Sequence, residues 1–114
     1  MRLYTRQEFL SLPAGVIFAK YEPHYFNEWQ IKGNTLPPND FYYQDFVSID
    51  TSAYEEHLEA CEDFVKNKTA TVDFHDWRRD GLYETDEVLF AVLEAHEISG
   101  LIQRLQETLK EGYA

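Results

Sequence analysis

Polar and apolar residues alternate along residues 28–32, a period of two that is typical of a strand with one face in water. Two neighbouring stretches, 16–21 and 41–49, are rich in β-branched and aromatic residues and predict two further strands. The first half of the chain is therefore expected to form most of a β-sheet.

Local signals predict where these strands begin and end. Thr5 and Glu8 have the spacing of a capping box, which predicts a short helix over residues 6–11. Gly33-Asn34 predicts a turn, and the two prolines within residues 36–40 predict a loop, because proline cannot donate a hydrogen bond to a strand ladder.

A longer amphipathic helix is predicted next. Ser52 and Glu55 repeat the capping-box spacing, and Asn67-Lys68 is expected to end the helix. The apolar stripe that should face the core consists of Tyr54, Leu58, Cys61 and Val65.

The last third of the chain adds two strands and a helix. Residues 69–74 alternate, Asp80-Gly81 predicts a turn, and the unbroken apolar run 88–93 is interpreted as a buried strand in preference to the start of a helix. A final helix from Ala95 to a stop at Gly112 presents an apolar stripe of Ile98, Leu101, Ile102, Leu105 and Leu109.

This order of elements predicts a single α+β domain over residues 1–114. We expect a mainly antiparallel sheet of about five strands, with the two longer helices packed on it and a short N-terminal helix.

Composition narrows the class of protein. The longest apolar runs, 14–19 and 88–93, are far shorter than the ~20 residues that cross a bilayer, and the single Cys61 has no partner for an internal disulfide. No basic segment leads into an apolar one near Met1, so we expect a cytoplasmic, non-membrane protein. The net charge of −11 disfavours direct binding of duplex nucleic acid, because such binding depends on Lys and Arg.

The negative charge is local. Residues 40–63 contain eight acidic residues and no Lys or Arg. If the second helix turns its apolar stripe inward, Glu55, Glu59 and Glu62 form an outward ridge that a basic, DNA-reading surface could accept as a decoy. The alternative is a solvated face that only aids solubility. The candidate contact adds the neighbouring carboxylates Asp45, Asp50 and Asp63.

A second candidate site surrounds the basic doublet of the chain. Guanidinium groups beside aromatic rings can hold the phosphate and base of a small nucleotide. The alternative is an ordinary surface pair neutralised by Asp76 and Asp80. The site comprises His75, Trp77, Arg78, Arg79 and Tyr83, and Lys20 and Lys32 could complete it.

Catalytic and metal-binding patterns are sparse. His57 and Cys61 could both ligate a metal, but a structural zinc site needs four ligands, so core packing is the preferred interpretation. His75 with Asp73 or Asp76 would suit a small metal-dependent hydrolase, yet no motif of a known hydrolase accompanies them. We therefore predict no catalytic residue, no metal ligand and no cofactor.

Aromatic residues crowd the early strands. Alternation places Tyr42 on the face opposite Phe41 and Tyr43, so one layer cannot cover all three. Exposed Tyr is frequent at protein interfaces, which suggests that Tyr42 contributes to a contact in a homodimer or with a partner.

Short motifs along most of the chain carry a resemblance. These are Tyr4-Thr5-Arg6-Gln7-Glu8-Phe9-Leu10, Leu12-Pro13-Ala14-Gly15, Lys20-Tyr21-Glu22-Pro23, Ile31-Lys32-Gly33, Asn39-Asp40-Phe41-Tyr42-Tyr43, Arg79-Asp80-Gly81-Leu82-Tyr83 and Leu89-Phe90-Ala91-Val92. Together they resemble small uncharacterised proteins of bacteriophages and prophages. The resemblance implies an accessory protein that blocks a host factor, including a defence system, by charge mimicry or by sequestering a signalling nucleotide.

We therefore expect a non-enzymatic, phage-type accessory protein in the cytoplasm of an infected or lysogenic bacterium. Its acidic surface would bind and block a host protein, such as a basic nucleic-acid-binding one, in a counter-defence role. The alternatives are sequestration of a small nucleotide and hydrolysis by a small metal-dependent enzyme.

Overall fold

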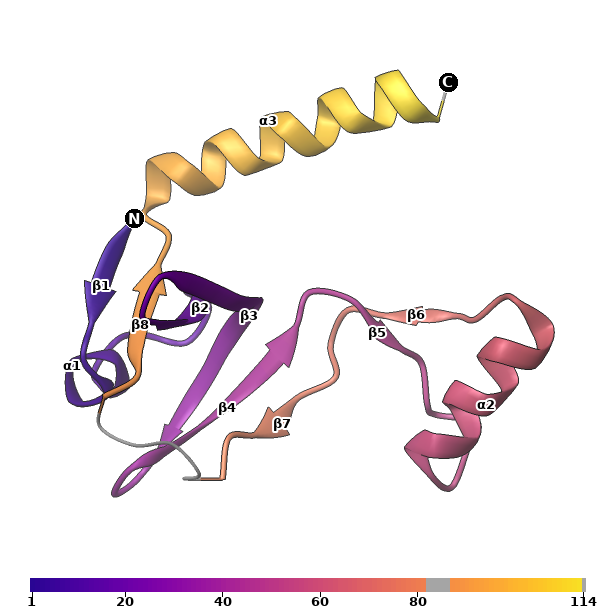
Figure 1. Cartoon of the computed structure of the whole chain (residues 1–114), viewed down its shortest axis with the longest axis horizontal. Coiled ribbons are helices and arrows are strands. Elements are labelled where there is room, and N and C mark those ends of the chain that lie inside the picture. The colour runs from indigo at the N-terminus through magenta and orange to yellow at the C-terminus, as the bar shows by residue number, and fades with distance from the viewer. Residues whose placement is uncertain (82–86, 114) are drawn as a thin grey trace.

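The computed structural model describes residues 1–81 and 87–113 and has an α+β fold (Figure 1). One antiparallel sheet contains six strands in the order β1-β8-β2-β3-β4-β7, and β5 and β6 form a separate pair. The predicted fold class is thus confirmed. The elements are β1 (Arg2–Tyr4), α1 (Arg6–Leu10), β2 (Ile17–Glu22), β3 (Tyr25–Leu36), β4 (Asp40–Asp45), β5 (Ser48–Ile49), α2 (His57–Asn67), β6 (Val72–Asp73), β7 (Arg78–Arg79), β8 (Leu89–Val92) and α3 (Ala95–Gly112).

The N-terminal helix forms where the capping box predicts it. Thr5 Oγ1 accepts the Glu8 N–H at 3.3 Å, and the Glu8 carboxylate accepts the Thr5 N–H at 3.0 Å. These two bonds satisfy amides that would otherwise have no partner at the start of α1. The helix turns Arg6, Phe9 and Leu10 toward the protein interior.

Four phenylalanines form the centre of the core. The Phe9 ring stacks on Phe90 with centroids 4.2 Å apart, and lies 4.7 Å from Phe18 and 5.1 Å from Phe41. All four side chains are fully buried. Phe9 comes from α1 and the others from β2, β4 and β8, so this cluster fixes α1 against one face of the six-stranded sheet.

Strands form within each predicted stretch, but not always with the predicted length, and β1 and β7 form where no strand was predicted. The predicted loop is confirmed as a turn at residues 37–39, although Leu36 and Asp40 belong to β3 and β4. Gly33-Asn34 lies inside β3 and is not a turn. The pairing of β3 with β4 shifts register between Lys32 and Thr35, which accommodates Gly33. A Cβ at Gly33 would lie 2.9 Å from both Trp77 Cζ3 and Tyr42 Cβ, so close packing explains the glycine.

Two predicted strands are interrupted. The stretch 41–49 bends after β4, and its last residues form β5, which pairs with β6 instead of continuing the large sheet. Of the strand predicted over residues 69–74, only Val72–Asp73 forms a strand, β6. In contrast, the apolar run 88–93 is confirmed as β8, a strand between β1 and β2 that needs apolar residues on both faces.

The second helix starts later than predicted. α2 begins at His57 with Glu56 as its N-cap residue, and Ser52 does not cap it. Ser52 belongs to a turn in which its own N–H donates to Asp50 Oδ1 at 2.9 Å. The carboxylate of Asp50 therefore organises this segment as a turn and delays the helix.

The two longer helices do not pack on the large sheet as expected. Among the described residues, only α1 packs closely on it; α2 joins β5 and β6 in an arm, and α3 projects away from the sheet (Figure 1). Leu58 and Val65, which were expected to face the core, are 63% and 70% exposed. The radius of gyration is accordingly 16.2 Å, against about 13 Å for a compact chain of this length.

None of the described helices is both long enough and apolar enough to pass through a membrane.

The core cluster gives a direct test of the fold. Replacing Phe9 with alanine should lower the free energy of unfolding by about 3–5 kcal/mol, because it removes the ring that contacts the other three phenylalanines. Leu58→Ala, at an exposed position of α2, is the control and should cost less than about 0.5 kcal/mol. Urea unfolding measures both values, and equal losses would contradict this description of the core.

Candidate functional site

The arm formed by α2, β5 and β6 positions the predicted acidic contact. Within this arm Ala60 of α2 is 2% exposed, and Ala60 and Phe64 line a small hollow that Ile49 of β5 also borders. Lys68 ends the helix in a left-handed conformation with φ of 64°, and its N–H donates to the Phe64 carbonyl at 2.8 Å. The end of this helix is therefore confirmed at Asn67-Lys68.

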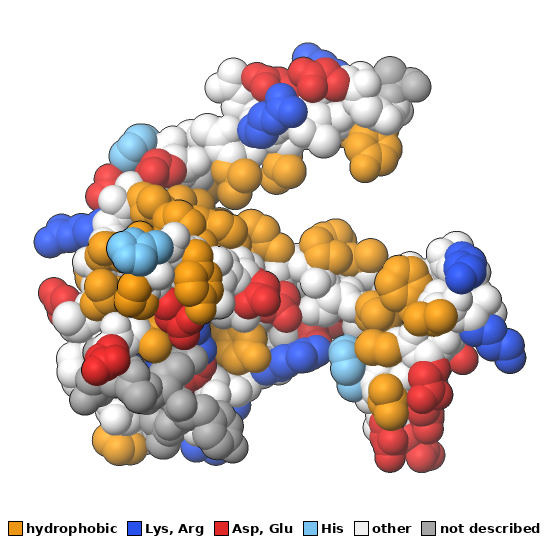
Figure 2. All heavy atoms as spheres, in the orientation of Figure 1, with side chains coloured by type: hydrophobic (Ala, Val, Ile, Leu, Met, Phe, Trp, Pro, Cys, Tyr) orange, Lys and Arg blue, Asp and Glu red, His pale blue; other side chains and the backbone are white. Residues whose placement is uncertain are grey.

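The acidic ridge, which we define as Glu55, Glu59 and Glu62, is on the solvent side of this arm. All three residues are exposed, and acidic side chains gather on this part of α2 in Figure 2. Within residues 1–81 and 87–113, no Lys or Arg forms an ion pair with any of the three. Glu56, the N-cap residue, is exposed beside them.

The neighbouring carboxylates do not belong to the ridge. Asp63 accepts a hydrogen bond from the Tyr54 hydroxyl, which raises the pKa of Tyr54. The backbone N–H of Ser52 lowers the pKa of Asp50, and Asp45 Oδ1 accepts from Gln30 Nε2 at 2.9 Å. Each of these three carboxylates thus has a structural partner, which the charge count of the sequence could not reveal.

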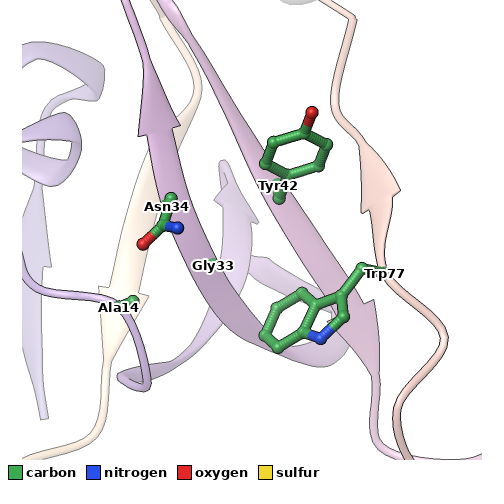
Figure 3. A pocket seen from close by; sticks show the side chains of 5 residues that line it. All are labelled: Ala14, Gly33, Asn34, Tyr42 and Trp77. Carbon is green, nitrogen blue, oxygen red and sulfur yellow. The ribbon is translucent and has the colours of Figure 1, made fainter.

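Tyr42 lies on β4 of the large sheet, outside the arm that carries the ridge, and helps to form a cavity. The cavity has a volume of about 390 Å³ and is lined by Ala14, Gly33, Asn34, Tyr42 and Trp77 (Figure 3). Trp77 covers Gly33 from one side, and Tyr42 and Asn34 border the same space. Trp77 was predicted as a ligand-binding residue, whereas Ala14, Gly33 and Asn34 were not.

The two arginines of the doublet do not converge on one site. β7 pairs with β4 so that Arg79 is opposite Tyr42 and Arg78 is opposite Tyr43, which places the two guanidinium groups on opposite faces of the sheet. Arg78 Nη2 pairs with Asp76 at 3.0 Å, a hydrogen bond that raises the pKa of Arg78. The predicted neutralisation of the doublet is therefore right for Asp76.

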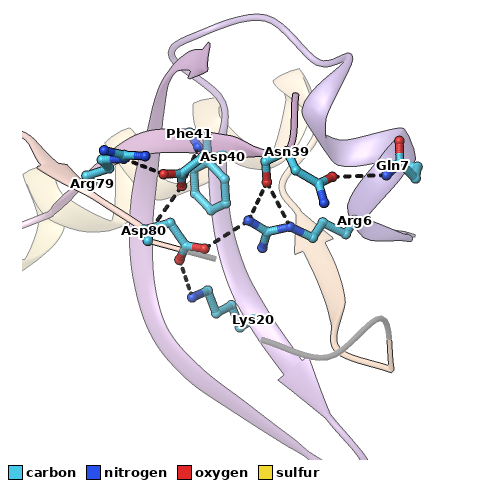
Figure 4. A network of polar contacts seen from close by, with 9 residues as sticks. Arg6, Gln7, Lys20, Asn39, Asp40, Phe41, Arg79 and Asp80 are labelled. Atoms are coloured by element: carbon cyan, nitrogen blue, oxygen red, sulfur yellow. Dashed lines mark hydrogen bonds and ion pairs between the residues drawn. The ribbon is translucent and has the colours of Figure 1, made fainter. Parts of the chain in front are cut away.

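Arg79 pairs with a buried carboxylate that belongs to a polar network (Figure 4). Its Nε donates to Asp40 Oδ2 at 2.5 Å, and Asp40 Oδ1 accepts the Phe41 and Gly81 N–H groups at 2.8 and 3.0 Å. Asp80 does not pair with the doublet, as one interpretation expected, but holds Arg6 at 3.1 Å and Lys20 at 2.6 Å. Lys20, which was predicted to complete the ligand site, is therefore part of this network.

Lys32 is also unavailable for the predicted ligand site. Its Nζ is buried and donates to the Leu12 and Gly33 carbonyls at 3.0 and 3.2 Å and to Thr35 Oγ1 at 2.9 Å. Burial lowers the pKa of Lys32. Three oxygen acceptors satisfy the three ammonium donors, so the side chain tethers β3 to the segment after α1.

The candidate catalytic residues have other contacts. Asp73 Oδ1 accepts the backbone N–H of His75 at 2.8 Å and does not contact its ring, while Asp76 pairs with Arg78. Cys61 Sγ lies 3.4 Å from His57 Nε2, but His57 is exposed, so the expected packing of this residue in the core is wrong. Tyr83, the remaining predicted ligand-binding residue, lies outside the described residues.

One cluster of possible metal ligands does occur in the described part of the chain. Glu94, His96 and Glu97 lie close together at the start of α3. The Glu97 carboxylate, however, already accepts hydrogen bonds from the N-terminal ammonium and from the Glu94 N–H, which lower the pKa of Glu97. This cluster therefore has a structural role in starting α3 and holding it to Met1.

The network around Asp40 predicts a pH dependence of stability. Burial alone would raise the pKa of Asp40, but hydrogen bonds from Arg79, Phe41 and Gly81 outweigh it and hold the pKa below the ordinary value of 3.8. The unfolded chain therefore binds more protons than the folded one at low pH, so stability from this group is complete above pH 3.8 and lost below it.

Asp40→Asn should lower the free energy of unfolding at neutral pH by about 1–3 kcal/mol, because Arg79 loses its charged acceptor. It should also flatten the loss of stability as the pH falls from neutral to below 3.8. Urea unfolding across this pH range measures both effects, and an unchanged acid slope would show that Asp40 does not contribute.

Comparison of the chain with protein-family models, with curated proteins and with solved structures finds no match. The function is therefore inferred from the geometry of the surfaces described above.

Proposed function

We propose that this protein is a non-enzymatic accessory protein that binds and blocks a basic host factor through its acidic ridge. The observation that carries the proposal is the gathering of three exposed glutamates on one arm. Asp40, Asp76 and Asp80 are each paired with Lys or Arg, whereas Glu55, Glu59 and Glu62 are exposed on one arm without such partners among the described residues.

The geometry suits a partner that binds phosphates. Side chains three or four residues apart on a helix lie about 5–6 Å from each other, and like charges at this spacing repel by a few tenths of a kcal/mol. A partner with a row of Lys or Arg would relieve this repulsion on Glu59 and Glu62. Charge complementarity of this kind accelerates encounter and selects the partner.

Apolar residues beside the ridge favour a binding role over a purely solubilising one. Leu58 and Val65 are exposed on α2, and Phe64 is 43% exposed. Exposed ion pairs alone contribute little to affinity, so a stable complex also needs apolar contacts. α2 carries both acidic and exposed apolar side chains. An exposed leucine and an exposed valine would not be expected on a surface that served solubility alone.

Reversing the ridge charges tests the proposal. The triple variant Glu55→Lys, Glu59→Lys and Glu62→Lys should lower affinity for a partner captured from a bacterial host lysate by at least about tenfold. Binding of the wild-type protein should also weaken steeply as salt is raised, because the contacts are screened. Pull-down across a salt series, followed by titration of the isolated partner, measures both.

A matched control variant replaces three glutamates with lysine at positions outside the ridge. Glu28, Glu87 and Glu111 are exposed and are distributed over other parts of the chain, so changing them to lysine alters net charge equally. This variant should retain binding. Salt-insensitive binding, or equal loss in both triple variants, would contradict recognition by the ridge.

The cavity beside Trp77 supports a second candidate function, the sequestration of a small nucleotide. Its volume of about 390 Å³ lies within the range of small-molecule sites, and Trp77 and Tyr42 offer aromatic surface on which a base could stack. The exposed Asn34 adds an amide that can donate and accept hydrogen bonds at the same cavity. The arginines contribute less than expected, because Arg78 lies on the opposite face.

A panel of nucleotides in a thermal-unfolding assay tests this candidate. A nucleotide at 100 times its dissociation constant should add about 2.7 kcal/mol to the free energy of unfolding. Trp77→Ala should remove the effect, whereas Tyr25→Ala, at an aromatic position of similar exposure on β3, should not. No stabilisation by any nucleotide would rule out this function.

A further inference from the structure

α3 carries an apolar stripe that its own chain leaves uncovered. Ile102, Leu105 and Leu109 are 54%, 59% and 66% exposed, and none of the described residues of this 18-residue helix is buried. Helices in proteins gain most of their stability from packing of the apolar face. This stripe therefore requires a surface to pack against that a single copy of the chain does not supply.

A complementary hollow lies at the base of the same helix. Met1, Leu3, Tyr21, Phe26 and Ala91 border a depression of about 270 Å³. Strand pairing places Leu3 opposite Ala91, and Ala91 opposite Ala19, on the sheet face away from the Phe9 cluster. In Figure 2, hydrophobic side chains line the underside of α3 and also the surface across the opening beneath it.

The exposed area has the size that a stable dimer requires. The chain exposes 8267 Å², whereas a folded monomer of 13.5 kDa is expected to expose about 6,500 Å². The excess is about 1,750 Å² per chain, and permanent homodimers bury from about 1,000 to more than 2,500 Å² on each partner. One homodimer contact removes an area of this order from each chain.

Charge does not prevent two copies from meeting at this surface. α3 contains Arg104 and Lys110 against three glutamates, and Arg104 pairs with Glu107 and Glu111 on the helix itself. The acidic ridge lies instead on the other arm, with α2. The stripe on α3 and most of the lining of the hollow are therefore apolar, as the centre of a homodimer interface is.

We propose that the concave side of α3 and of the sheet is the interface with a second copy of this chain. In this symmetric dimer, the stripe of α3 packs into the sheet hollow of the partner, and the partner's helix packs into the hollow of the first copy. The arrangement is isologous, so the two contacts are identical and the assembly closes at two chains. It leaves the acidic ridge exposed on both arms.

The dimer predicts a mass of twice 13.5 kDa, measured by sedimentation equilibrium of the full chain over a wide range of concentration. Leu105→Glu on α3 and Leu3→Glu in the hollow should each raise the dissociation constant at least about tenfold, because either charge would be buried at the contact. Leu105 is 59% and Leu3 48% exposed in one chain, so near-ultraviolet circular dichroism should show that the monomer fold is retained.

A matched control and a mixing experiment separate the possible arrangements. Gln106→Glu introduces the same charge at an exposed polar position of α3 and should leave the dimer intact. Mixing Leu105→Lys with Leu3→Glu should restore dimers, because the mixed pair has one unaltered contact and one contact between opposite charges.

Three results would overturn the proposal. The first is a single-chain mass at every concentration, and the second is a dimer that Leu105→Glu leaves intact. The third is a dimer that Leu105→Glu disrupts and Leu3→Glu does not, which would mean that two helices pair and that the hollow plays no part.

Discussion

The packing of Phe9 against three phenylalanines of the sheet is the interaction on which the rest of the structure depends. It attaches α1 to one face of the sheet and buries the centre of β2, β4 and β8. Because α1 is the only described helix that packs closely there, this small cluster is the hydrophobic core of the large sheet. The opposite sheet face and the two long helices do not pack on this core, and they are the surfaces that we propose for contacts with other chains.

Charge is arranged in two different ways in the same chain. Around the core, Asp40 and Asp80 are buried and hold Arg79, Arg6 and Lys20 in a network that connects α1, β2, β4 and β7. Such groups must be paired, because an unpaired charge in the interior is strongly unfavourable. On the α2 arm, the glutamates of the acidic ridge remain in water and have no such constraint. The first set stabilises the fold, and the second is the surface that we propose for recognition of a basic partner.

The proposed function and the proposed dimer use different surfaces and are compatible. The ridge lies on the outer side of the α2 arm, whereas the apolar stripe of α3 faces the concave side of the molecule (Figure 2). A dimer would present two ridges, so a partner with two basic sites could bind both with an effective concentration that increases overall affinity. The open shape of a single chain then has a physical explanation, because it leaves room for elements of the second copy.

The sequence by itself determined the elements whose signals are local. The capping box of Thr5 and Glu8, the turn at the prolines, the apolar strand β8 and the amphipathic α3 all depend on residues close together in the chain. Only the tertiary structure decided which surfaces these elements face. Periodicity shows that Leu58 and Leu105 share a helix face with other apolar residues, but not whether anything covers that face. Likewise, the burial of Lys32 and the pairing of Arg79 with Asp40 depend on residues brought together from distant segments, and no local pattern encodes such partners.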